Sequence, residues 1–145
     1  MKRLAVCLLL LVCWVGPVRG ADAPVTPRQH PIDAEVERLA GLDPSTAGLL
    51  QAYAKGYDLW DKELNRVYRE LMAFLAKDGK GKQAVKEAQV AWLAFRDREF
   101  AAIDAVYAHL EGTMYRPMQA YARLEVVKTR TLTLADWLAL LREPQ

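Results

Sequence analysis

Apolar residues recur at alternating spacings of four and three along three long stretches of the chain. That spacing places them on one face of an α-helix and predicts amphipathic helices that bury this face. The first stretch follows Asp43-Pro44-Ser45, a typical helix start, and the third begins around Pro117. The repeating residues are Tyr53, Tyr57, Trp60, Leu64, Val67, Leu71 and Phe74 in the first stretch, Val85, Ala88, Trp92, Phe95, Ala102 and Val106 in the second, and Leu124, Val127, Thr131, Leu134, Leu138 and Leu141 in the third.

No stretch shows the alternation typical of a β-strand, so the pattern predicts an all-α fold. We expect two long helices in a hairpin, joined at the glycine- and lysine-rich residues 77–82, with the third helix packed along them in a three-helix bundle. Residues 32–42 predict an additional short helix, because Ile32, Val36 and Leu39 share one face.

The N-terminal residues have the pattern of a secretory signal peptide. Basic residues precede an unbroken apolar run at 4–15, and small residues stand at the expected cut, Gly20–Ala21. The run is shorter than the about 20 residues that span a bilayer, so we expect no stable membrane span after cleavage. A lipid-anchored protein and a retained N-terminal anchor are the alternatives. Residues 1–20 are thus assigned to the signal peptide, residues 21–31 to a flexible proline-rich leader and residues 32–145 to one helical domain, in the periplasm or outside the cell.

Removal of the signal peptide changes the charge and the chemistry of the chain. Lys+Arg falls from 20 to 17 against 18 Asp+Glu, so the net charge changes from +2 to −1. No basic tract remains, which argues against a nucleic-acid partner. Cys7 and Cys13 also leave, so the exported chain contains no thiol.

Few remaining side chains are suited to catalysis or to metal binding. Ser45, the only serine, stands at an expected helix N-cap, where capping explains it better than nucleophilic attack. His30 and His109 do not have metal-ligand spacing from other histidines or from acidic residues. We therefore predict a protein that is not an enzyme and uses no metal or other cofactor.

Polar residues beside the apolar stripes form the first candidate site. Asp61 and Asn65 share a face of the first helix with Tyr68, although Asn is a poor helix former in mid-helix. We predict that Asn65 and Asp61 face the second helix, within hydrogen-bond or ion-pair reach of Gln89 or Arg96. Such a polar layer would fix the register of the helices. The alternative is a ligand site between the helices.

Three segments and Arg130 together match one known pattern. The segments are "STAGLLQAYAKGYDLWDKELNRVYRELMAFL", "AQVAWLAFRDREF" and "GTMYRPM". Their residues follow Y-x-x-x-D-x-x-L-N-x-x-Y-x-x-L and then Q-x-x-W-x-x-[FY]-R-D-x-E. The chain therefore resembles, over about residues 32–142, the N-terminal domain of the LprI-type lysozyme inhibitors of the bacterial envelope. The signature and the polar layer together comprise Tyr57, Asp61, Leu64, Asn65, Tyr68, Gln89, Trp92, Arg96, Glu99 and Arg130.

The chain departs from the family at its cysteines. The resemblance implies cysteines near Leu39, Ala52, Phe100 and Ala122, where this chain has apolar residues. If the family pairs the first two and the last two, each disulfide is replaced here by one large and one small apolar residue. That exchange keeps the volume and loses the cross-link.

The resemblance implies a protein partner, with lysozyme as the first candidate. The segment between the second and third helices has the mixture of residues that interfaces favour, namely Glu111, Thr113, Met114, Tyr115 and Arg116. The alternative is an ordinary helix connection. We expect a non-enzymatic binding module that inhibits lysozyme, or else a structural or adaptor protein of the cell envelope without lysozyme activity. The sequence leaves the oligomeric state open.

Overall fold

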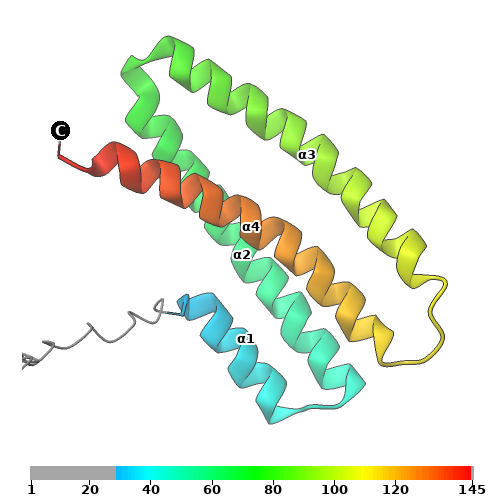
Figure 1. Cartoon of the computed structure of the whole chain (residues 1–145). Coiled ribbons are helices and arrows are strands. Elements are labelled where there is room, and N and C mark those ends of the chain that lie inside the picture. The colour runs from blue at the N-terminus through cyan, green and yellow to red at the C-terminus, as the bar shows by residue number, and fades with distance from the viewer. Residues whose placement is uncertain (1–28, 145) are drawn as a thin grey trace, which may run out of the picture.

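The computed structural model describes residues 29–144, and these residues form helices joined by short connections (Figure 1). The elements are α1 (Pro31–Leu42), α2 (Thr46–Phe74), the 3-10 turn η1 (Leu75–Lys77), α3 (Gly79–Tyr107) and α4 (Tyr115–Arg142). No strand occurs between residues 29 and 144. The all-α prediction and the short N-terminal helix are therefore confirmed. The predicted signal peptide and most of the predicted leader lie outside the described residues.

Side-chain caps fix where two of the long helices begin. Ser45 Oγ accepts a hydrogen bond of 3.1 Å from the Gly48 amide at the start of α2. Asp78 Oδ1 accepts one of 3.0 Å from the Gly81 amide at the start of α3. Such caps satisfy amides that have no partner within the helix. Because Asp78 caps α3, the helix break is narrower than predicted, and most of the predicted linker belongs to the first turns of α3.

The core lies between α2 and α4, with α1 packed across α2. The buried apolar residues are Val36 on α1, Ala52, Trp60, Leu64, Val67 and Leu71 on α2, and Leu124, Val127, Leu134 and Leu138 on α4. Val36 belongs to the face predicted for residues 32–42, and the others, apart from Ala52, belong to the apolar stripes of the first and third stretches. Phe74 and Leu141, at the ends of these two stripes, are 50 % and 37 % exposed, so their expected burial is wrong. The third long helix packs along α2, as expected.

Gly56 allows three helices to approach one another closely. A Cβ at this position would lie 2.5 Å from Val36 Cγ2 and 2.6 Å from Leu124 Cδ1. Carbon atoms do not approach so closely without strain. An ion pair supports the same junction, because Lys128 Nζ on α4 lies 3.0 Å from Asp33 Oδ2 on α1.

The helix α3 is placed differently from the expected hairpin. It leaves α2 at the η1 turn, diverges from it and returns to α4 through residues 108–114 (Figure 1). None of its residues, all of which the structure describes, is buried. In the predicted stripe, Phe95 is 52 % exposed and Val106 is 62 % exposed. The expectation that this stripe would be buried is therefore wrong, because α4 occupies the place along α2 that we assigned to α3.

Between residues 29 and 144, no helix is apolar over a stretch long enough to cross a membrane. In the same range, no three His, Cys, Asp or Glu residues are grouped in a way that could hold a metal ion.

Candidate protein-binding site at the connection between α3 and α4

Asn65 and Asp61 do not form the predicted layer with α3. Asn65 Nδ2 donates to the backbone oxygen of Asp61 at 2.8 Å and to Asp61 Oδ2 at 3.1 Å, and the side chain is exposed. The prediction that these residues reach Gln89 or Arg96 is therefore wrong. Asn65 adjoins the buried row of α2 without belonging to it, and its own helix supplies both acceptors.

A polar link between helices does exist, but it joins α3 to α4. Arg130 Nε donates to Gln89 Oε1 at 3.0 Å. The guanidinium of Arg130 lies 5.9 Å from the ring centre of Trp92 and 5.6 Å from that of Trp137. Burial lowers the pKa of Arg130 from its usual value. Two predicted members of the layer, Gln89 and Arg130, are thus in contact.

Arginines and aromatic rings alternate along this whole interface. Arg96 lies 5.7 Å from the Trp92 ring centre and 5.9 Å from that of Phe100, and Arg123 on α4 lies 5.3 Å from the latter. We call the series the arginine–aromatic ladder; in order it comprises Arg123, Phe100, Arg96, Trp92, Arg130 and Trp137. Cation–π contacts of this kind join side chains that are only partly desolvated. The ladder therefore attaches α3 through partly buried side chains, two of which, Trp92 and Phe100, also pack against the edge of the core.

The remaining signature residues are divided among different surroundings. Leu64 is part of the core, and Tyr68 packs against it. Tyr57 lies 6.1 Å from the Phe100 ring, and burial is the main reason why its pKa is raised. Glu99 is half-buried in a groove of about 450 Å³ between α3 and α4. We call this the α3–α4 groove; it is lined by Trp92, Phe95, Glu99, Ala122, Glu125, Val126, Thr129, Arg130 and Thr133.

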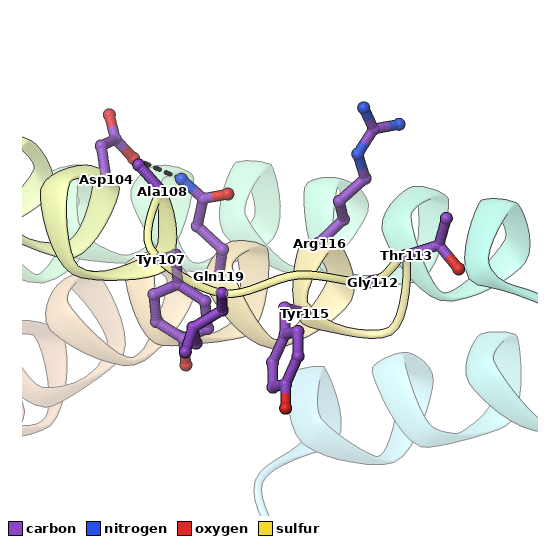
Figure 2. A pocket seen from close by; sticks show the side chains of 9 residues that line it. Asp104, Tyr107, Ala108, Gly112, Thr113, Tyr115, Arg116 and Gln119 are labelled. Atoms are coloured by element: carbon purple, nitrogen blue, oxygen red, sulfur yellow. Dashed lines mark hydrogen bonds between the residues drawn. The ribbon is translucent and has the colours of Figure 1, made fainter.

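The second predicted site, the connection between α3 and α4, is held in place at its base. Asp104 on α3 accepts a hydrogen bond of 2.7 Å from Gln119 Nε2 on α4 (Figure 2). It also forms an ion pair with Arg123 on α4. Gly112 has a φ of +111°, a conformation that residues with a Cβ rarely adopt. The Tyr115 amide then donates to the Gly112 oxygen at 3.5 Å, which begins α4. A short, tethered segment of this kind presents its side chains in a defined geometry.

Side chains of the connection point in two directions. Arg116 extends away from the helices, whereas Tyr107 and Tyr115 project on the opposite side (Figure 2). The end of α3, the connection and the start of α4 together line a hollow of about 580 Å³. Thr113, Tyr115 and Arg116 contribute to it.

A second hollow, of about 490 Å³, adjoins the connection, and a larger share of its lining residues is apolar than in the first hollow. It is lined by Pro44, Thr46, Leu49, Tyr53, Tyr107, Met114, Pro117, Met118, Tyr121 and Ala122. Tyr53 and Tyr121 form an edge-on pair with ring centres 5.2 Å apart. The hollow exists because the start of α2 and the α3–α4 connection lie at the same end of the molecule, away from the C-terminus (Figure 1). We call the two hollows and the connection together the connection surface.

Residues at the start of α2 and just before it were not part of the predicted site. Pro44 and Leu49 contribute to the connection surface, yet they are distant in sequence from residues 111–116. Met118 and Tyr121 could have been found, because they follow Met114 at about one-turn spacings along α4. Glu111 is exposed beside the hollows and does not line either of them.

The positions where the resemblance implies cysteines are filled by apolar packing. Leu39 and Ala52 line one small hollow between α1 and α2. Phe100 packs against the core and under the guanidinium of Arg123. The described residues contain no cysteine, so non-covalent contacts alone join these helices.

Comparison with known proteins places the chain in a family and finds a similar solved structure. The family model described as "Lysozyme inhibitor LprI" matches residues 40–134. A crystal structure of an uncharacterized protein from Burkholderia thailandensis has a TM-score of 0.71 and 29% sequence identity. The match covers 80% of this chain and 57% of that one, so this chain spans little more than half the length of the solved protein. No curated protein matches the chain.

Proposed function

The chain belongs to the LprI lysozyme inhibitor family, and from this premise we propose that it is a non-enzymatic module that binds a protein through the connection surface. We further propose that the partner is a lysozyme. The match covers the connection and all of α3, so the family assignment includes the residues of the proposed site.

The observation that carries the proposal is the exposure of large apolar side chains at this end of the molecule. Met114 is 63 % exposed, Met118 47 % and Tyr121 43 %, and they surround the apolar hollow. Tyrosine and methionine are enriched in protein interfaces, and the thioether side chain adapts to irregular surfaces. Their clustering at one end of the molecule distinguishes the connection surface from a connection that only joins two helices.

The charges around the connection surface support recognition by shape and apolar contact. Asp104 and Arg123 neutralise each other, and Glu111 and Arg116 carry opposite charges within the same connection. A surface of this kind gives little electrostatic steering toward a basic partner. We therefore expect inhibition to depend only weakly on salt concentration, which would not hold for an acidic plug.

A turbidity assay of cell-wall lysis tests the proposal. The exported protein, titrated against a basic lysozyme, is expected to slow lysis. Alanine at Met114 or Tyr115 should weaken inhibition roughly tenfold or more, as truncation of a central interface residue does. Alanine at Glu111, on the rim, should have a smaller effect.

Leu140→Ala is the matched control for the lysis assay. Leu140 is 64 % exposed, as open as Met114, but it lies near the other end of α4. It should inhibit as the wild type does, and all variants should keep the helical circular dichroism spectrum. Absence of inhibition by the wild type at a large molar excess would contradict a role as lysozyme inhibitor. The adaptor function would then be favoured, and affinity capture from an envelope extract would identify the partner.

Export is the other part of the proposal. A partner outside the cytoplasm requires that residues 1–20, which lie outside the described residues, act as a cleaved signal peptide. N-terminal sequencing of protein recovered from the cell envelope should begin at Ala21. A sequence that begins at Met1, or a lipid on Cys13, would contradict this assignment.

A further inference from the structure

One side of α3 presents an apolar face that no element between residues 29 and 144 covers. Phe95, in its middle, also lines the α3–α4 groove. The residues of the face share one side of the helix by their spacing: Ala84, Ala88, Ala91, Phe95, Ala102 and Val106. Phe95 and Val106 are the large members, and both are more than half exposed. We propose that a second copy of this chain covers this face, with the α3 helices of the two copies packed antiparallel.

Charges at the edge of the face select the second copy and its direction. Glu87 and Arg98 are both exposed and lie on the same edge, about three helical turns apart. Arg98 forms no salt bridge in the described part of the chain. In a parallel pair, this edge of one copy would lie across the contact from the same edge of the other, so Glu87 and Arg98 would meet neither each other nor their own counterparts. In an antiparallel pair, Glu87 of each copy meets Arg98 of the other, which gives two identical ion pairs.

The shapes of the side chains favour the same register. When Glu87 and Arg98 are level, Phe95 is level with Ala91 of the second copy to within about one residue rise, ~1.5 Å. Ala84 is then level with Ala102 of the second copy in the same way. A large ring thus packs against a small residue on either side of the two-fold axis, and small residues oppose each other farther out. Close packing of two helices requires this kind of complementarity.

A face that is complementary to itself about a two-fold axis is what an isologous dimer requires. The contact is one pair of helices and is smaller than a standard stable interface, so the dimer is expected to form in a concentration-dependent way. The contact uses the middle of α3, and the inference does not rest on the function proposed for the connection surface.

Sedimentation equilibrium of the protein recovered from the cell envelope tests the dimer. Between about 1 µM and about 1 mM, a range that covers weak association, the mean mass of the wild type should rise from that of a monomer toward twice this value. Phe95→Glu should remain monomeric throughout. Val90→Glu is the matched control, because Val90 is 62 % exposed on another side of the same helix. It should associate as the wild type does, and both variants should keep the helical spectrum.

A charge exchange tests the antiparallel register separately. Arg98→Glu or Glu87→Arg alone should weaken association roughly tenfold, because each makes two like-charge contacts across the axis. The double variant, Glu87→Arg with Arg98→Glu, should restore the wild-type constant to within about twofold. A wild type that stays monomeric at every concentration, or equal losses in Phe95→Glu and Val90→Glu, would overturn the dimer. Failure of the double variant to recover association would overturn the antiparallel pairing.

Discussion

The helix α4 contacts its two long neighbours through two different kinds of interface. Against α2 it is dry and apolar: Trp60, Val127 and Leu134 are all 0 % exposed. Against α3 it relies on the arginine–aromatic ladder, on the Gln89–Arg130 hydrogen bond and on the contacts of Asp104. Burial of apolar surface stabilises a protein in proportion to its area, whereas partly exposed cation–π contacts contribute about 0.5–1 kcal/mol each. We therefore expect α1, α2 and α4 to form the stable part of the domain, with α3 attached more weakly.

Truncation in the dry interface should have the largest effect. Leu134→Ala removes a fully buried side chain between α4 and α2 and should lower the free energy of unfolding by about 2–5 kcal/mol. The matched variant Leu140→Ala, on the same helix but exposed, should change it by less than about 0.5 kcal/mol. Urea unfolding followed by circular dichroism measures both. Equal losses in the two variants would contradict the division between a dry and an open side of α4.

Truncation in the ladder should have an intermediate and local effect. Trp92→Ala removes the ring that lies between Arg96 and Arg130, and should lower the free energy of opening of α3 by roughly 1–2 kcal/mol. Hydrogen exchange read by mass spectrometry should show faster exchange in peptides of α3, while peptides of the cores of α2 and α4 keep most of their protection. A uniform loss of protection in all helices would show that α3 unfolds together with the rest of the domain.

The difference between the two interfaces also decides what the sequence could predict. Burial was predicted correctly for most of the stripes of α2 and α4, except Phe74 and Leu141 at their ends, because large apolar residues such as Trp60 and Leu134 belong to one core. The stripe of α3 has the same spacing, and it too contains large apolar residues such as Trp92 and Phe95, but spacing does not specify which neighbour covers a face. Gln89 and Arg96 were expected to face Asp61 and Asn65 on α2. Gln89 instead accepts from Arg130 on α4, and Arg96 lies over Trp92 of its own helix, because a guanidinium can stack on a ring while it stays partly hydrated.

The connection surface was predictable only in part for a related reason. Met114, Tyr115 and Arg116 were identified from their residue types within one segment. Pro44 and Leu49 join them only because the fold brings the start of α2 to the same end of the molecule. Such proximity depends on helix lengths and on which helices pair, which local spacing does not contain.

Substitution of Arg130 separates the two contributions to the ladder, namely charge and stacking. Arg130→Lys keeps the charge but loses the planar group that lies over Trp92 and Trp137. Arg130→Met keeps most of the volume and removes a cation whose pKa burial already lowers. We expect the lysine variant to lose about 1 kcal/mol of stability and the methionine variant to lose less. Urea unfolding compares them, and a lysine variant as stable as the wild type would show that charge alone accounts for the contact.

Asn65 gives the smallest expected effect and concerns neither interface of α4. Its amide donates only to Asp61, four residues earlier on the same exposed side of α2. Asn65→Ala loses these bonds, but water replaces them on an exposed surface, and alanine is the better helix former by a few tenths of a kcal/mol. The melting temperature should therefore stay the same or rise by about 1–2 °C, since about 1 kcal/mol corresponds to roughly 4–8 °C in a domain near this size. Leu64→Ala, one residue earlier and buried in the core, is the control and should lower the melting temperature markedly. A clear fall in the melting temperature of Asn65→Ala would mean that its amide has a partner on α3, and that α3 lies closer to α2 than this arrangement allows.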